Sequence, residues 1–299
     1  MFAYSDVEAV VVGGGLVVLL GFFDDAFGLD ALTKLAGQVV AAGVMVLIGL
    51  QIVTLTLPGV GAVALGPEGV PLTIALALLT VNAINFVDGL DGLAAGVGAI
   101  AALAFFTFSY SLSSGQLTSG VLQERISSPT LIAVVLAGAC LGFLPHNFNP
   151  ARVFMGDTGS MLIGLMLAGS VTSLTGQFSF SNLPPSTAFP ALFIVLLPLA
   201  VLAVPFVDLL LAVVRRTRAG RSPFAPDKAH LHHRLLEIGH SQTRAVLIMY
   251  FWTALLAFGG VAASVTGGPL RVLSVVIALA LVALVLATLP RLRAARRRA

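Results

Sequence analysis

Residues 10–50 read VVVGGGLVVLLGFFDDAFGLDALTKLAGQVVAAGVMVLIGL, two apolar runs joined by a short polar segment. This segment sets two adjacent carboxylates, Asp24 and Asp25, directly after hydrophobic sequence. Burying an unpaired carboxylate costs several kcal/mol, and inside a membrane such a group marks a functional position. We therefore expect the pair either to face water at the end of a helix or to hold a cation.

The rest of the chain is equally apolar. Of its 299 residues, 58% are hydrophobic and 10% are charged, and the mean hydropathy is +1.03. Soluble domains have about 25% charged residues, so the composition excludes a soluble globular protein. Long apolar runs separated by Gly, Pro, Ser and charged residues predict an all-α polytopic transmembrane bundle in a single domain, 1–299. The single cysteine, Cys140, allows no intrachain disulfide.

The hydropathy pattern predicts about nine transmembrane helices. Their approximate ranges are 7–23, 35–56, 70–86, 93–112, 130–145, 159–175, 189–214, 245–266 and 270–290.

Positive charge indicates which loops face the cytoplasm. Lys and Arg crowd the loop 215–244 and the C-terminal tail, and the positive-inside rule places both on the cytoplasmic side. Counting spans in pairs puts the loops 24–34, 86–92 and 146–158 on that same side. Because these four loops also carry most of the polar motifs, we predict that they form one cytoplasmic active face.

The first motif is the acidic pair itself, followed by Lys34. One interpretation of Asp24 and Asp25 is that they are simply charged residues at the end of a helix, without a ligand. The functional alternative is metal or phosphate chemistry, with Lys34 returning after a short turn to offer an ammonium to a phosphate.

The second motif is NAINFVDGLDGL, residues 82–93. Asn82, Asn85 and Asp88 are spaced three apart and therefore share one helical face, and Asp91 adds an acid on the following turn. Helix-to-helix hydrogen bonding with a capped turn would explain the pattern without any ligand. Amide oxygens beside carboxylates also suit a hard cation such as Mg²⁺.

The third motif is HNFNPARVFMGDTGSM, residues 146–161. Asp157 precedes Gly159 and Ser160 at the expected start of a helix, where it could serve only as an N-cap. A helix N-terminus also favours phosphate, and Phe154 offers an aromatic face for a base.

The fourth motif is SPFAPDKAHLHHRLLEIGHS, residues 222–241. A helical projection places His230, His233 and Arg234 on one polar face, opposite a leucine face, as in an interfacial helix. The H-x-H-H spacing matches no structural zinc pattern, so phosphate or sugar hydroxyls are the better ligands.

These four motifs, in this order, resemble the polyprenyl-phosphate N-acetylhexosamine-1-phosphate transferase family, and the resemblance covers nearly all of the chain. FMGDTGS and NAINFVDGLDGL are its most specific parts. The fourth motif is similar to the WecA-like branch, which uses UDP-N-acetylglucosamine (UDP-GlcNAc). The MraY-like branch, which uses UDP-N-acetylmuramoyl-pentapeptide, has three consecutive histidines where this chain reads His230, Leu231, His232, His233.

The resemblance implies transfer of a sugar 1-phosphate from a UDP-sugar to a polyprenyl phosphate at the cytoplasmic face of a bacterial cell membrane. It implies Mg²⁺ as the cofactor, with Mn²⁺ as a possible substitute. It implies no nucleic-acid partner and is compatible with a homodimer. The implied site residues are Asp24, Asp25, His230, His232 and His233 as catalytic groups, Lys34, Asn82, Asp88, Asp91, Phe154 and Arg234 as substrate-binding groups, and Asn85 and Asp157 as metal ligands.

Three alternatives stay open at this point: the MraY-like reaction, a truncated inactive scaffold, and a transporter. The second arises because members of this family usually have two further spans and a Gly-rich cytoplasmic loop before the equivalent of residue 1. A transporter is disfavoured because transporters usually carry polar groups at the membrane midplane, whereas the predicted span centres here are almost bare.

Overall fold

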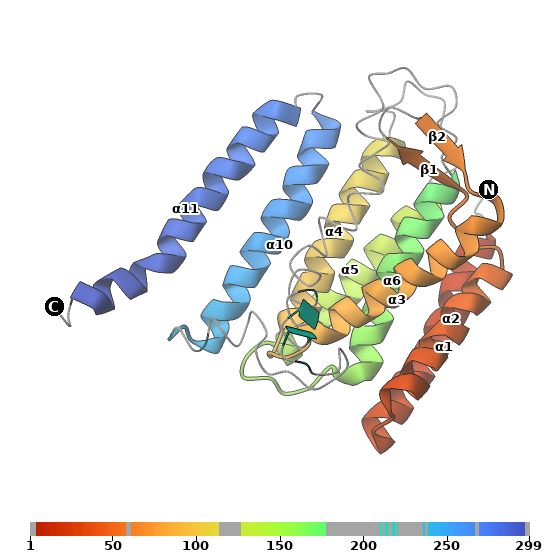
Figure 1. Cartoon of the computed structure of the whole chain (residues 1–299), viewed down its shortest axis with the longest axis horizontal. Helices are drawn as coiled ribbons and strands as arrows, with labels where there is room; N and C mark the ends of the chain where they lie inside the picture. Colours follow the sequence, from red (N-terminus) through yellow and green to blue (C-terminus); the bar gives the residue numbers. More distant parts are fainter. Residues whose placement is uncertain are drawn as a thin grey trace.

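The computed structural model describes residues 4–57, 61–113, 127–177, 239–266 and 269–296, together with isolated residues between 210 and 236. These residues form a bundle of helices with one small hairpin at one end (Figure 1). The elements are α1 (Tyr4–Phe27), α2 (Ala31–Leu47), β1 (Thr54–Leu57), β2 (Gly61–Ala64), the 3₁₀ turn η1 (Gly66–Glu68), α3 (Gly69–Val87), α4 (Leu93–Ser113), α5 (Ser127–Asn147), α6 (Gly156–Gln177), α10 (Gln242–Val265) and α11 (Pro269–Arg296).

The polytopic helical bundle predicted from composition is confirmed. In the described part of the chain, six helices are long and apolar enough to cross a membrane, and Ala31–Leu47 and Leu270–Ala283 are shorter apolar helices. A helix of 24 residues, such as α1, is about 36 Å long and exceeds the hydrocarbon thickness of a bilayer. The predicted span 189–214 lies outside the described residues, apart from a few isolated positions.

The predicted span 35–56 was too long, and its last residues belong to a hairpin rather than a helix. α2 ends at Leu47, and Gly49 follows with a φ of +111°. β1 then pairs antiparallel with β2, with Thr54 opposite Ala64 and Leu57 opposite Gly61. The sequence TLTL alternates β-branched and apolar residues, a pattern that fits a pleated strand better than a helix.

α1 and α2 are joined by a turn much shorter than the predicted loop 24–34. α1 continues through both aspartates to Phe27, and Gly28 ends it in the left-handed conformation, with a φ of +67°. Asp30 then caps α2 by accepting hydrogen bonds from the backbone N–H groups of Leu32 (3.0 Å) and Thr33 (3.1 Å). Because only three residues separate the helices, their polar ends are held side by side.

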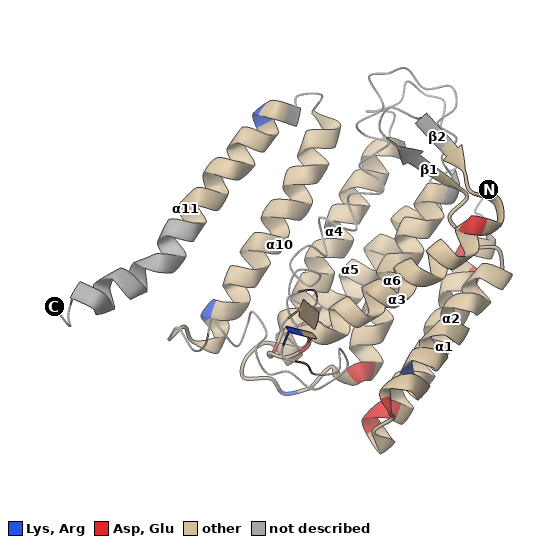
Figure 2. Ribbon diagram, viewed as in Figure 1, with Lys and Arg blue, Asp and Glu red and all other residues tan. Residues whose placement is uncertain are grey.

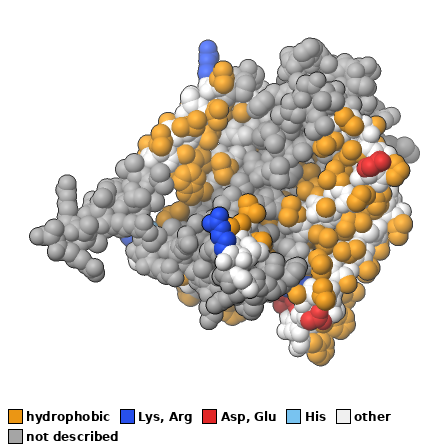
Figure 3. All heavy atoms as spheres, in the orientation of Figure 1, with side chains coloured by type: hydrophobic (Ala, Val, Ile, Leu, Met, Phe, Trp, Pro, Cys, Tyr) orange, Lys and Arg blue, Asp and Glu red, His pale blue; other side chains and the backbone are white. Residues whose placement is uncertain are grey.

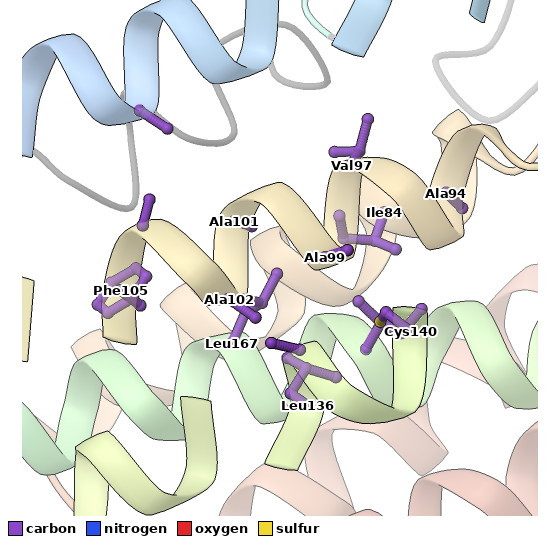
Figure 4. Packing of buried hydrophobic residues seen from close by; sticks show 14 of the residues in the cluster. Ile84, Ala94, Val97, Ala99, Ala101, Ala102, Phe105, Leu136, Cys140 and Leu167 are labelled. Atoms are coloured by element: carbon purple, nitrogen blue, oxygen red, sulfur yellow. The ribbon is translucent and has the colours of Figure 1, made fainter. Parts of the chain in front are cut away.

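The core is built from small side chains that let the helices approach closely. α4 contributes a row of fully buried alanines, among which Phe105 and Phe108 fill the remaining space. Figure 4 shows Leu136 and Cys140 from α5 and Leu167 from α6 among these alanines. Small residues are typical of helix interfaces in membranes, where close van der Waals packing replaces the hydrophobic effect.

α6 occupies the centre of the bundle. It packs against α1, α3, α4 and α5, while α10 packs on α4 and α11 packs on α10. The outer faces carry exposed hydrophobic side chains, visible across α1 to α3 in Figure 3. The N-terminus of α6 therefore lies where several helix ends meet, and this position determines the site.

Candidate active site

The polar ends of four helices gather at one end of the bundle, opposite the hairpin (Figures 1 and 2). Among the described residues, segments 24–34, 86–92 and 146–158 lie at this end, and their role as one cytoplasmic active face stays a prediction. The groups brought there are Asp24 and Asp25 at the end of α1, Lys34 at the start of α2, Asn85 and Asp88 at the end of α3, and Asp157 at the start of α6.

Lys34 bridges two carboxylates from different helices. Its Nζ lies 2.7 Å from Oδ2 of Asp24 and also contacts Oδ2 of Asp157. Asp24 is oriented by its second oxygen, Oδ1, which accepts a hydrogen bond from the backbone N–H of Leu29 (2.8 Å). The ammonium therefore neutralises a pair of acids that would otherwise repel each other.

Asn85 holds Asp157 from the opposite side. Its Nδ2 donates to Oδ1 of Asp157 (2.7 Å) and to Oγ of Ser160 (3.0 Å). Both carboxylate oxygens of Asp157 thus have a side-chain partner, one a cation and the other an amide. Asn85 and Asp157, the two implied metal ligands, are therefore in direct contact, with the amide nitrogen directed at the acid.

Asp25 has a different task from Asp24. Its Oδ1 accepts from the backbone N–H of Asp157 (2.8 Å), and its Oδ2 accepts from N–H (3.1 Å) and Oγ1 (2.7 Å) of Thr158. Asp25 therefore caps the N-terminus of α6 from another helix. The plain interpretation of Asp157 as that cap is wrong, because Asp25 takes the free amides.

This cross-helix cap depends on a close approach of backbones. A Cβ on Gly21, one turn before Asp25, would lie 2.5 Å from Cα of Thr158. No side chain fits at that distance, so Gly21 lets α1 reach the end of α6.

Asp88 lies just beyond α3, and its pKa is raised from 3.8 to about 7. Burial is the largest cause, followed by the negative charges of Asp157, Asp25 and Asp91. A carboxyl with this pKa is poised to change its charge near neutral pH when a cation approaches.

The turn that carries Asp88 and Asp91 is fastened to its neighbours. Buried Asn147 accepts from the N–H of Gly92 (3.0 Å) and donates to the carbonyl of Val153 (2.9 Å), so it ties the turn to the loop after α5. Oδ2 of Asp91 accepts from Nδ2 of Asn149 (2.9 Å) and from the N–H of Ala151 (3.2 Å). Tyr250 on α10 donates its hydroxyl to the carbonyl of Gly92.

The other predicted site residues have different surroundings. Phe154, three residues before Asp157, is 77% exposed. Asn82 points deeper into the bundle, where its Nδ2 donates to Oε1 of Gln38 (2.7 Å) and to the carbonyl of Leu78 (2.8 Å). His230, His232, His233 and Arg234 lie outside the described residues.

Sequence reasoning missed Gln38, Thr158 and Ser160. Gln38 carried a readable signal, since it is a polar residue within an apolar run and four positions after Lys34. Thr158 and Ser160 sit inside the quoted GDTGS motif, but nothing in their local sequence shows that their partners are Asp25 and Asn85.

The described residues contain no group of three or more His, Cys, Asp or Glu side chains that could hold a metal ion alone. They do offer oxygen donors on two adjacent acids, Asp24 and Asp157. Mg²⁺ is commonly bound through one or two carboxylates together with substrate phosphates, so a full protein cage is not required. The donor chemistry therefore fits a magnesium ion that arrives with a phosphate substrate.

Comparison with known proteins agrees with this chemistry. Residues 7–175 match the family model described as Glycosyl transferase family 4, which covers α1 to most of α6 and includes the site.

Named relatives extend the match over nearly the whole chain. The chain is 51% identical over 301 residues to decaprenyl-phosphate N-acetylglucosaminephosphotransferase of Mycolicibacterium smegmatis, covering 98% of this chain and 72% of that protein. It is 51% identical over 296 residues to the protein of the same name from Mycobacterium tuberculosis, with the same coverage. A probable undecaprenyl-phosphate N-acetylglucosaminyl 1-phosphate transferase of Bacillus subtilis is 34% identical over 251 residues, 84% of this chain and 64% of its own length.

Proposed function

Because the chain belongs to glycosyl transferase family 4, we propose that it transfers N-acetylglucosamine 1-phosphate from UDP-GlcNAc to a polyprenyl phosphate and releases UMP. The chain is a multi-pass membrane protein, and its named relatives are bacterial. The product of the proposed reaction is a lipid-linked sugar for cell-envelope synthesis. The names of the mycobacterial relatives point to decaprenyl phosphate as the acceptor.

The observation that carries this proposal is the Lys34 bridge between Asp24 and Asp157 at the N-terminus of α6. A lysine ammonium, two carboxylates and a helix N-terminus suit a phosphate-transfer site, in which charges must be neutralised and redistributed. The exposed Phe154 is next to this position in sequence and suits the base of a nucleotide.

In the reaction, an oxygen of the acceptor phosphate attacks the sugar-bearing phosphorus of UDP-GlcNAc. A new P–O bond forms there, the bond from that phosphorus to the bridging oxygen breaks, and UMP leaves with that oxygen. The acceptor phosphate has a second pKa near 6 and is mostly a dianion at neutral pH, so positioning matters more than a strong base. Lys34 can turn from its carboxylates toward the incoming phosphate.

The two adjacent aspartates take different roles in this mechanism. Asp25 is bound to backbone groups of α6, which are fixed, so it positions Asp157. Asp24 is paired with the flexible side chain of Lys34 and becomes available when that lysine moves. We assign Asp24 as the residue that orients the acceptor phosphate and Asp25 as a positioning residue.

Asp157, Asp24 and Asn85 are the residues that would hold Mg²⁺, together with phosphate oxygens of the substrate. When bound, Mg²⁺ would supply charge neutralisation at the diphosphate and the leaving UMP. His230, His232, His233 and Arg234 are proposed to bind the diphosphate-sugar end, and Asp91 the nucleoside.

The decisive experiment supplies the purified protein with decaprenyl phosphate, Mg²⁺ and one radiolabelled donor at a time. We expect lipid-linked label from UDP-GlcNAc and none from UDP-N-acetylmuramoyl-pentapeptide. Label from the pentapeptide donor alone would overturn the sugar assignment. Label from neither would favour a catalytically silent protein.

The proposed cytoplasmic location of the site has its own test. On a Cys140→Ala background, a cysteine at Ala26 should not react with an impermeant thiol reagent added to intact cells, and should react after the membrane is opened. A cysteine in the hairpin, at Ala64, is the matched control on the other end of the bundle and should react in intact cells. Reaction at Ala26 from outside would reverse the orientation.

A further inference from the structure

We propose that Gln38 and Asn82 form a positioning pair that sets the register of α2, α3 and α6, and so places Lys34, Asn85 and Asp157 for phosphate transfer. This inference rests on the proposed function, which it deepens by assigning work to two residues below the site. Asn82 then acts through Asn85, rather than by touching substrate.

The three helices contribute two layers of side chains, one turn apart. The upper layer is the site, where Lys34 and Asn85 both contact Asp157. In the lower layer, Nδ2 of Asn82 donates to Oε1 of Gln38 (2.7 Å), and Nε2 of Gln38 lies 3.7 Å from Sδ of Met161.

Each helix supplies one residue to each layer. On α2 the two are Lys34 and Gln38, four apart; on α3 they are Asn85 and Asn82, three apart; on α6 they are Asp157 and Met161, four apart. Residues three or four apart are neighbours on one face of a helix, so the lower contacts fix the height and rotation of the upper ones.

The lower layer is well suited to set a register. Gln38 is 2% exposed and Met161 is fully buried, so the Gln38 end of the hydrogen bond is shielded from water, while Asn82 is half-buried. A broken bond leaves the buried Oε1 of Gln38 without its donor, which penalises every register except the one that pairs the two side chains. Apolar packing alone is less selective, because it tolerates sliding between smooth helix surfaces.

The geometric effect of a slip is large. Each residue of a helix rises about 1.5 Å and turns by about 100°, so even a fraction of a residue moves Lys34 relative to Asp157. Displacing a reacting group by about 1 Å can lower the rate about 100-fold.

The test compares two variants at one position. Gln38→Met keeps the length of the side chain but removes the acceptor, and we expect kcat to fall about 10- to 100-fold with the KM for UDP-GlcNAc unchanged. Gln38→Glu keeps an acceptor oxygen for Asn82 and should recover most of that loss. Asn82→Leu should match Gln38→Met, and the double variant should fall no further, since both remove the same bond.

Stability provides the matched control. Met45→Ala removes a buried side chain from α2, two turns beyond Gln38, and should lower the melting temperature without a comparable loss of kcat. If Gln38→Met lowers kcat only as much as Met45→Ala does at an equal loss of stability, Gln38 is merely structural. If Gln38→Glu is as impaired as Gln38→Met, the hydrogen bond is not the cause.

A second measurement needs no turnover. A carbodiimide should join Lys34 to Asp157 or Asp24 through an amide bond, the reagent taking up the water, because the ammonium touches both acids. Peptide mass spectrometry should find this cross-link in the wild type and in Val39→Ala, an exposed neighbour, but much less of it in Gln38→Met. An undiminished cross-link in Gln38→Met would overturn the inference, whereas a wild type that cross-links but does not turn over would count against the proposed function alone.

Discussion

The two halves of the site are held together by different kinds of contact. In the charged half, formed by Asp24, Lys34 and Asp157, α1, α2 and α6 meet through ion pairs. In the neutral half, the turn 88–92 is fastened by Asn147, Asn149 and Tyr250 through hydrogen bonds between amide, carbonyl and hydroxyl groups, together with the carboxylate of Asp91.

This difference separates the working part of the site from its scaffold. Ion pairs at a partly exposed position are weak, and a phosphate or a metal ion can replace either partner. Hydrogen bonds from a buried asparagine to backbone groups are costly to break and offer nothing to a ligand. We therefore expect changes in the charged half to affect turnover, and changes in the neutral half to affect stability and nucleotide binding.

The largest effect should come from Asp157. Asp157→Ala and Asp157→Asn should both lower turnover by at least about 100-fold while membrane insertion stays normal, because the negative charge itself is required near the phosphates. Asp30→Asn, which keeps the cap of α2, is the control and should remain active. Near-normal activity of Asp157→Asn would show that hydrogen bonding alone suffices there.

The next largest effects should distinguish the two adjacent aspartates, Asp24 and Asp25, because one acts in turnover and the other in stability. Asp24→Asn, which keeps an acceptor for the N–H of Leu29, should lose about 100-fold in turnover at a nearly unchanged melting temperature, since the ion pair contributes little to stability. Asp25→Ala should instead lower the free energy of unfolding by about 1–2 kcal/mol, the usual cost of a lost helix cap. Equal melting temperatures for the two variants would contradict the assignment of Asp25 as the cap of α6.

Within the neutral half, Asn147→Ala should reduce stability by about 1–3 kcal/mol, because it strands the N–H of Gly92 and the carbonyl of Val153. The KM for the UDP-sugar should rise more than kcat falls, since the turn also carries Asp91. Tyr250→Phe, which removes one hydrogen bond to the same turn, is the graded comparison and should cost only about 1 kcal/mol. If Asn147→Ala lowers kcat more than it raises the KM for the UDP-sugar, the neutral half takes part in the reaction itself and is not only a scaffold.

The last effect is on stability rather than on turnover, and it concerns pH and Asp88, whose pKa is about 7 in the folded protein and 3.8 ordinarily. Between these values the folded chain keeps a proton that the unfolded chain has lost, so the stability contributed by this group decreases as pH rises from about 4 to 7 and is constant above. Without added metal, the melting temperature of the wild type should therefore fall across this range relative to Asp88→Asn, by a few degrees. Parallel curves for the two proteins would contradict the raised pKa.

Local sequence was a good guide to the helices and a poorer guide to where they end. Hydropathy identified the apolar runs because each residue contributes independently to membrane partition. The end of α2 was misplaced because the strand sequence TLTL is apolar enough to continue a hydropathy window, whereas its alternation favours a hairpin. The aspartates 24 and 25 were assigned to a loop because charge was read as an end, although α1 continues to Phe27.

The members of the charged half were also predictable, but not their contacts. Asp24, Lys34, Asn85 and Asp157 were all selected from motifs, since polar groups at the ends of apolar helices are conspicuous. Their pairing was not readable, and nor was the division of labour between Asp24 and Asp25, which have identical side chains and adjacent positions.

The sequence by itself determined that this chain is a membrane-embedded helical bundle and that Asp24, Lys34, Asn85 and Asp157 stand at the ends of its apolar runs, because hydropathy and helical spacing are local properties. Tertiary structure alone decided that Lys34 meets Asp157, 123 positions away, that Asp25 caps the helix carrying that acid, and that Gln38 pairs with Asn82. These contacts depend on how closely α1, α2 and α3 approach α6. That approach is set by small residues such as Gly21 packing against another backbone, a relation between distant segments that no local pattern contains.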